Sequence, residues 1–150
     1  MTDHLKPSWT PMNDGTGELV ASARCGQWAG EGRGYTDGCQ LRAFAADARR
    51  FPLDPNHPVR IVTGYGSLSE PDDFHATIDV RLIELGHRGQ LGACVRLSSF
   101  VWPDEPIAGA GSLELVLPTS YQRAAEFAHE IDNLLAVAAN EATLGSERFS

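Results

Sequence analysis

The sequence lacks the features that mark several large classes of protein. Its 150 residues contain no apolar run near the roughly 18 residues that a membrane-spanning helix needs, and no apolar signal segment behind a basic start. It has 12 basic against 20 acidic side chains, a net charge of −8, whereas nucleic-acid binding depends on lysine and arginine to neutralise phosphates. We therefore expect a cytoplasmic protein that binds neither membranes nor nucleic acid.

Motifs for catalysis, cofactors and metals are also missing. The five histidines include no i,i+4 pair on one helix, and with the three cysteines they fit no zinc-site spacing. The glycines at 30, 32 and 34 lack the Lys-Ser/Thr of a P-loop and the G-x-G-x-x-G spacing of a dinucleotide site. The sequence thus assigns no catalytic residue, no cofactor and no metal. It predicts that Cys25, Cys39 and Cys94 are free thiols.

The N-terminal quarter of the chain shows little periodicity. Residues 1–17 contain two prolines and a turn sequence, so they predict a flexible N-terminal arm. Residues 18–25 predict a weak strand, and 26–38, with five glycines, predict a loop. The last residues, 145–150, predict a frayed tail. These boundaries leave 18–144 as a single α+β domain.

Two amphipathic helices are predicted. Residues 39–51 place apolar side chains at helical spacing, after Asp37 as a capping residue and before Pro52. A longer helix is predicted over 119–141, where Thr119 and Gln122 form a capping-box pattern.

Between the helices the apolar period changes from helical to two. Residues 59–63, 77–85, 91–100 and 112–117 predict strands, with Cys94 on the polar side of its strand. The short connection at 86–90 makes the second and third of these strands antiparallel neighbours. The predicted fold is therefore α+β, with an antiparallel sheet of about four to five strands covered on one face by two amphipathic helices.

Aromatic side chains in loops or at strand ends are the feature that points to function. They are Trp28, Tyr35, Tyr65, Phe74, Phe100 and Trp102. Aromatics with acidic neighbours suit a protein-recognition surface, although the same residues can instead plug the ends of a sheet. The candidate protein-binding residues, in the segments 64–75 and 100–106, are Tyr65, Asp72, Asp73, Phe74, His75, Trp102, Asp104 and Glu105.

The sequence therefore favours a non-enzymatic, acidic protein that binds another protein, with a basic surface as the expected complement. The net charge is concentrated in the final helix and in residues 67–75. Unpaired strand edges at 112–117 or 18–25 would allow a homodimer. The alternative is a small enzyme with a pocket between sheet and helices, in which His75, Cys94 and a carboxylate would converge.

Two resemblances bear on this prediction. The order from Gly64-Tyr65 through the strands at 77–85 and 91–100 to Trp102 and a closing helix resembles small bacterial immunity-type proteins of the WapI kind. That resemblance implies binding and neutralising a toxin. The order of helix, strands and helix with a low pI is similar to small secretion-chaperone-like domains, which are usually dimeric. The usage of alanine, glycine and arginine favours a bacterial or phage source.

Overall fold

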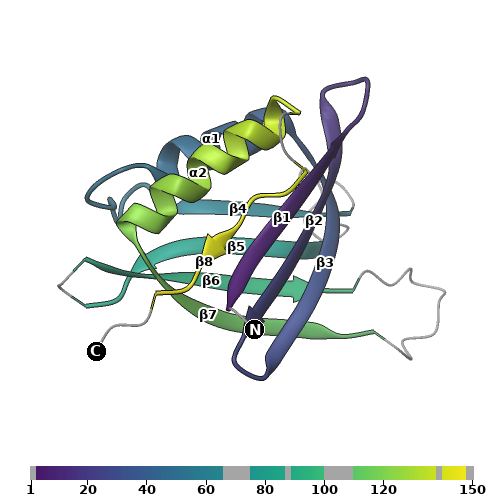
Figure 1. Cartoon of the computed structure of the whole chain (residues 1–150). Coiled ribbons are helices and arrows are strands. Elements are labelled where there is room, and N and C mark those ends of the chain that lie inside the picture. The colour runs from purple at the N-terminus through teal and green to yellow at the C-terminus, as the bar shows by residue number, and fades with distance from the viewer. Residues whose placement is uncertain (1–2, 66–74, 87–88, 100–109, 138–139, 148–150) are drawn as a thin grey trace.

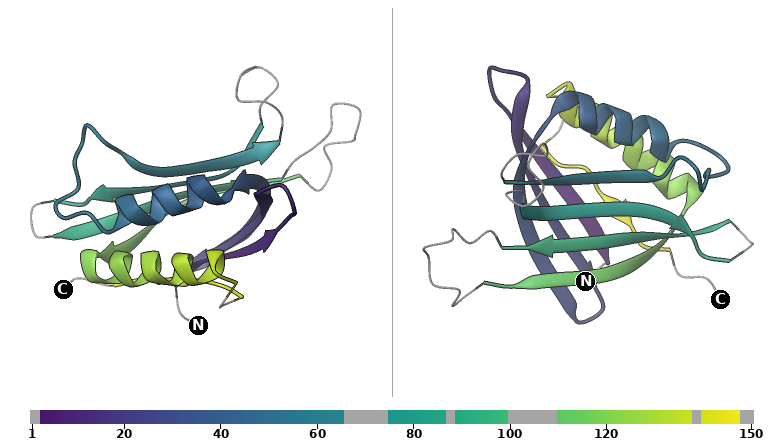
Figure 2. Two further views of the ribbon diagram at one scale, coloured as in Figure 1. Left: turned by 90° about the horizontal axis from the view of Figure 1, so that it is seen from above. Right: turned by 180° about the vertical axis from the view of Figure 1, so that it is seen from behind.

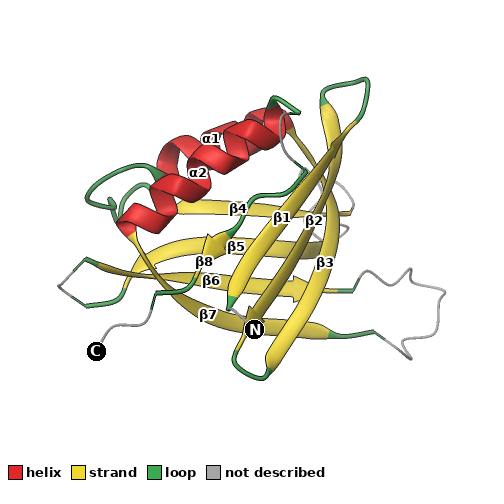
Figure 3. Ribbon diagram, in the orientation of Figure 1, coloured by secondary structure: helices red, strands yellow, loops and turns green. Residues whose placement is uncertain are grey.

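A computed structural model describes residues 3–65, 75–86, 89–99, 110–137 and 140–147. Within these ranges the chain forms eight strands and two helices (Figures 1 and 3). In chain order they are β1 (His4–Pro11), β2 (Thr16–Cys25), β3 (Trp28–Asp37), α1 (Gly38–Ala48), β4 (Val59–Tyr65), β5 (His75–Glu84), β6 (Gln90–Ser98), β7 (Ser112–Ser120), α2 (Tyr121–Leu135) and β8 (Leu144–Gly145).

All eight described strands belong to one antiparallel sheet, in the order β7-β6-β5-β4-β3-β2-β1-β8. The expectation of four to five strands is therefore wrong. The strands at 59–63, 77–85, 91–100 and 112–117 are present as β4 to β7, and the weak strand at 18–25 is present as part of β2. The additional strands are β1 and β3 in the N-terminal region and β8 near the C-terminal end. Of the two segments considered for homodimer pairing, 112–117 lies at an edge, whereas β2 lies between β1 and β3.

The sheet bends sharply between β3 and β4. These strands share a single residue pair, Tyr35 with Gly64, whereas β2 and β3 pair along their whole length. As a result β1, β2 and β3 cross over one side of β4–β7, and the two helices lie on that same side (Figures 1 and 2). We call this covered side of β4–β7 the inner face and the opposite side the outer face.

The glycine-rich segment at 26–38 is a strand and not the predicted loop. Its glycines alternate, so Gly30, Gly32 and Gly34 all face inward, where β3 crosses the strands beneath it. A Cβ on Gly32 would lie 2.7 Å from the carbonyl oxygen of Thr77. Glycine is needed here because two backbones approach closely, and not because the chain turns.

The N-terminal segment is also more ordered than predicted. Residues 4–11, expected in an arm, form β1 between β2 and β8, with Leu5 and Pro7 buried. The expected tail contributes as well, because Gly145 lies in β8 and the Glu147 amide donates to the Pro118 carbonyl. Alternation at 4–8 was weak in the sequence because a proline occupies an inward position.

Both predicted helices are present with shifted ends. Asp37 caps α1 as predicted, since its carboxylate accepts from the Gln40 amide at 2.8 Å. The cap of α2 is Ser120, whose hydroxyl accepts from the Arg123 amide, while the Thr119 hydroxyl donates to the Gly145 carbonyl. No helix in the described part of the chain is long and apolar enough to cross a membrane.

The core lies between the inner face and the layer made by the helices and β1–β3. The alternation predicted for β5 and β6 is confirmed: Ile78, Val80 and Leu82 are buried on one face, as are Leu91, Ala93, Val95 and Leu97. The helices meet through Phe44 and Phe127, whose rings pack edge to face with centroids 6.4 Å apart. This packing leaves two sets of side chains available for contacts with other molecules. They are those on the outer face of β4–β7 and those of β3 that point away from the core.

Candidate functional site

Two of the eight candidate protein-binding residues, Tyr65 and His75, lie in the described part of the chain. The other six lie outside the described residues: Asp72, Asp73, Phe74, Trp102, Asp104 and Glu105. Phe100, a further aromatic of the predicted surface, also lies outside them.

Tyr65 and His75 are brought together because they end β4 and begin β5. They are direct cross-strand partners in the antiparallel pair. Gly64 allows this approach, since a Cβ there would lie 2.0 Å from the His75 carbonyl oxygen, and the register shifts between Thr63 and Gly64. The strand ends are therefore held tightly where the 64–75 segment departs.

The flanks of the second predicted loop lie at the same end of the sheet. His75 Nε2 is 3.3 Å from the Ser99 carbonyl oxygen, and the Ser99 amide donates to the Gly111 carbonyl at 2.8 Å. Residues 65, 75, 99 and 111 are thus neighbours. The structure brings together the bases of both segments that the sequence selected for protein binding.

Tyr35 completes this end of the sheet and was not among the candidate residues. Its ring packs edge to face against Tyr65, with centroids 5.6 Å apart and an interplanar angle of 84°. Tyr35 remains 44% exposed, and Tyr65 is half-buried beneath it. The alternation of glycine with Glu31, Arg33 and Tyr35 was the signal in the sequence that could have identified a strand with Tyr35 on its outward face.

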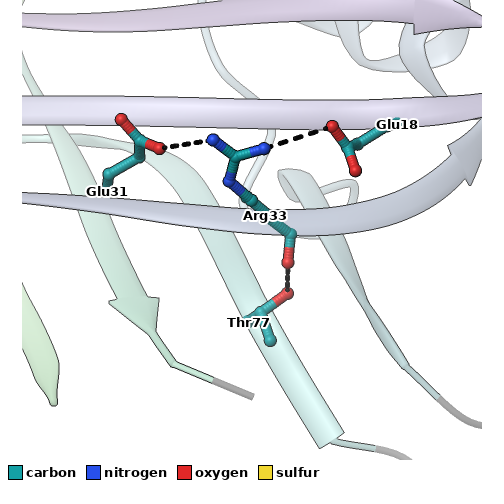
Figure 4. A network of polar contacts seen from close by, with 4 residues as sticks. All are labelled: Glu18, Glu31, Arg33 and Thr77. Carbon is teal, nitrogen blue, oxygen red and sulfur yellow. Dashed lines mark hydrogen bonds and ion pairs between the residues drawn. The ribbon is translucent and has the colours of Figure 1, made fainter. Parts of the chain in front are cut away.

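Charged side chains frame the two tyrosines. The Arg33 guanidinium lies between the carboxylates of Glu31 and Glu18, at 3.4 Å and 3.5 Å (Figure 4). The same residue is anchored through its backbone, because the Thr77 hydroxyl of β5 donates to the Arg33 carbonyl at 2.5 Å (Figure 4). This bond fixes β3 across β5 and so sets the position of the outward side chains of β3.

We use the name aromatic corner for Glu18, Arg33, Tyr35, Tyr65 and His75. Within it, burial raises the pKa of the Tyr65 phenol above its usual value, and the neighbouring Tyr35 and Glu18 raise it further, while Arg33 acts in the opposite direction. Tyr65 is therefore a neutral phenol at physiological pH. It therefore adds nothing to the negative charge of the corner.

The residues proposed for the enzymatic alternative do not converge. Cys94 lies on the outer face of β6 and pairs across the strand with Arg81, whereas His75 begins β5. Six residues of extended chain separate Arg81 from His75 along β5, which is about 20 Å. Cys94 and His75 are thus held at different places on the sheet.

One carboxylate of the acidic final helix is paired with a neighbouring element, since Asp132 of α2 forms an ion pair with Arg49. The helix's own Arg123 lies 3.8 Å from Glu147, outside the helix. The other acidic segment, 67–75, lies outside the described residues except for His75.

Metal and disulfide chemistry have no site among the residues described. No group of three His, Cys, Asp or Glu side chains in those ranges could hold a metal ion, and all three cysteines are free thiols. No protein-family model, no curated protein and no solved structure matches the chain.

Proposed function

We propose that this protein acts by binding another protein at the aromatic corner. The observation that carries the proposal is the Tyr35–Tyr65 pair, with Tyr35 exposed and Tyr65 half-buried, placed where the flanks of both predicted recognition segments meet. Tyrosine is enriched at the energetic centres of protein interfaces because it buries a large area while losing few rotatable bonds.

The charges at the corner favour a basic partner. Glu18 within the corner and Glu31 beside it outnumber Arg33, and the whole chain carries a net charge of −8. Opposite charge on a partner would steer the two proteins together and fix their relative orientation. Its main effect would be to raise the association rate. Because exposed charges are screened by salt, we expect binding to weaken as ionic strength rises.

The proposed interaction takes place in the cytoplasm. The three free cysteines support this, since thiols persist in reducing compartments and are commonly oxidised outside them. The exposed Cys39 on α1 is the thiol most open to oxidation if the protein were exported.

The test compares the partner proteins that are captured by the wild-type protein with those captured by two single variants. Tyr35→Ala removes the exposed ring of the corner, and Trp28→Ala removes a side chain that is 69% exposed at the other end of the same strand. We expect a partner that is retained by wild type and Trp28→Ala and lost by Tyr35→Ala. Titration calorimetry with that purified partner should show about a 30-fold loss of affinity for Tyr35→Ala, the size expected at an interface hot spot.

Equal retention by both variants would contradict the proposal. If the captured partner is toxic when produced alone, the function is neutralisation of a toxin; if it is not, the protein serves another binding role. In either case the loss must be confined to the Tyr35 variant.

A further inference from the structure

A depression on the outer face of β4–β7 gathers arginine side chains in a protein that is otherwise acidic. Its volume is about 180 Å³. The residues that line it come from four adjacent strands and are Arg60, Asp79, Arg81, Cys94, Val95, Arg96 and Glu114. Three of the eleven arginines in the chain therefore face one shallow surface.

The strand register sets these residues in two rows. Arg81 lies directly between Arg60 of β4 and Cys94 of β6. The next row runs from Asp79 to Arg96 and on to Glu114. Arg81 thus has another arginine as a direct cross-strand neighbour, an arrangement of like charges that costs stability.

Both carboxylates in the depression are already engaged. Asp79 accepts two hydrogen bonds from Arg60, from Nε at 3.0 Å and from the terminal nitrogen at 2.7 Å, in a bidentate pair. Glu114 accepts from Arg96 at 3.2 Å. Among the described residues Arg81 has no hydrogen-bond or ion-pair partner, so its guanidinium is open to a ligand.

A second depression, of about 370 Å³, lies on the other side of Arg81. Its lining is largely apolar, with Leu53, Pro55, Pro58 and Ile83 among its residues. Asp54 and Glu84 also line it, and each accepts a hydrogen bond, from the Asn56 amide and the Tyr121 hydroxyl. The Arg81 side chain is shared by a basic depression and an apolar one.

We propose that Arg81 anchors a binding site for a small organic anion that carries a carboxylate or phosphate group and a short apolar part. The guanidinium fork matches such an oxyanion in a bidentate geometry. The basic depression is smaller than the roughly 300 Å³ of a typical ligand pocket, so it holds the charged group alone. The apolar part of the ligand lies along Leu53 and Ile83 in the second depression, beside the carboxylates of Asp54 and Glu84.

This site is separate from the aromatic corner. Arg60 and Tyr65 stand at opposite ends of β4, five residues or about 16 Å apart. The proposal of an anion site can therefore be tested independently of the proposed protein binding.

Titration of the whole protein with four probes tests the site. The probes are acetate, hexanoate, inorganic phosphate and hexyl phosphate, followed through the backbone amide signals of Arg81, Cys94 and Val95 by NMR. We expect saturable shifts with hexanoate or hexyl phosphate and weaker binding of the matching short anion. The tighter of the two long probes identifies the charged group as carboxylate or phosphate.

Two variants make the test specific. Arg81→Gln should lower the affinity at least tenfold, whereas Arg42→Gln, at an exposed position on α1, should leave it unchanged. Ile83→Ala should weaken binding of the long probe and leave that of the short anion unaltered. Unchanged affinity in Arg81→Gln, or no saturable binding of either long probe, would overturn the proposal.

Cys94 supplies an independent readout because its thiol lines the basic depression. A saturating long probe should slow the alkylation of Cys94 by iodoacetamide at least threefold. The exposed thiol of Cys39 serves as the internal control and should react at an unchanged rate. Equal rates at Cys94 with and without the probe would count against the site even if weak shifts were observed.

Discussion

Replacing Gly32 by alanine tests whether β3 crosses β5 in direct backbone contact. An added Cβ would lie 2.7 Å from the Thr77 carbonyl oxygen, 3.2 Å from a side-chain carbon of Ile78 and 3.3 Å from one of Leu97. Carbon–oxygen contacts of this kind normally begin at about 3.3 Å, so the strands must separate by roughly 0.6 Å. The nearest atom belongs to the backbone of a central strand, which cannot rotate away.

The expected loss in the free energy of unfolding is about 2–3 kcal/mol, in the upper part of the range for overpacked cores. For a chain of this length that loss corresponds to a fall of about 5–10 °C in the unfolding temperature. Gly30→Ala should cost less, because its Cβ would meet a flexible Leu113 methyl group at 2.9 Å. The control is Gly111→Ala, where no heavy atom lies within 4 Å of the added carbon.

Urea denaturation followed by circular dichroism measures all three variants against wild type. We expect the order Gly32→Ala, Gly30→Ala, Gly111→Ala from least to most stable, with the last within about 0.5 kcal/mol of wild type. The urea dependence of the unfolding free energy should be the same as in wild type, since each variant exposes the same surface when it unfolds. Equal stability of Gly32→Ala and Gly111→Ala would refute the close crossing of β3 over β5.

Three further predictions concern the aromatic corner and the residues beneath it. Thr63→Val should be neutral or stabilising by up to about 1 kcal/mol in urea denaturation, because the Thr63 hydroxyl is buried without a partner among the described residues. Thr77→Val should lower the free energy of unfolding by about 1–2 kcal/mol, because it leaves the Arg33 carbonyl without its hydroxyl donor. The raised pKa of Tyr65 means that the folded state holds the phenol proton more tightly than the unfolded chain, so the contribution of Tyr65 to stability should be constant below about pH 10 and be lost above it. Tyr65→Phe should reduce that loss of stability when unfolding is measured at pH 9 and pH 11, and an unchanged pH dependence would show that Tyr65 is not the group responsible.

Elements whose periodicity reflects burial could be predicted from the sequence. The strands β5 and β6 bury one face only, so their alternation is clear. The start of α1 was marked by Asp37, whereas the helix ends at Ala48 and not at the predicted residue before Pro52. The strand β3 was missed because its inward positions are glycines, which carry no hydrophobic signal. The reason for those glycines is the crossing of β3 over β5–β7, a contact that depends on the sharp bend at Tyr35 and Gly64.

The candidate site was partly predictable for a similar reason. Tyr65 and His75 flank one segment of the chain, so their proximity follows from a hairpin, whereas Tyr35 reaches them through the folding of β3 across the sheet. Alternation places Asp79, Arg81 and Arg96 on one face of neighbouring strands, but it does not say which of them pair. The observed partner of Asp79 is Arg60, because pairing depends on register and rotamer, which alternation does not specify.

The pairing of β1 with β8 has a consequence for synthesis on the ribosome. On the side of β1 away from β2, His4 pairs with Gly145 and Leu5 pairs with Leu144, and the Asp3 carbonyl accepts a hydrogen bond from the Ser146 amide. A nascent chain can form the β1–β2–β3 hairpins early, but the outer edge of β1 stays open until residues 144–146 have emerged, several seconds later at typical elongation rates. During that interval β1 is an unprotected edge strand, the kind of element on which chains aggregate. Removal of residues 144–147 should therefore lower the yield of soluble protein more than the loss of four residues from a surface loop.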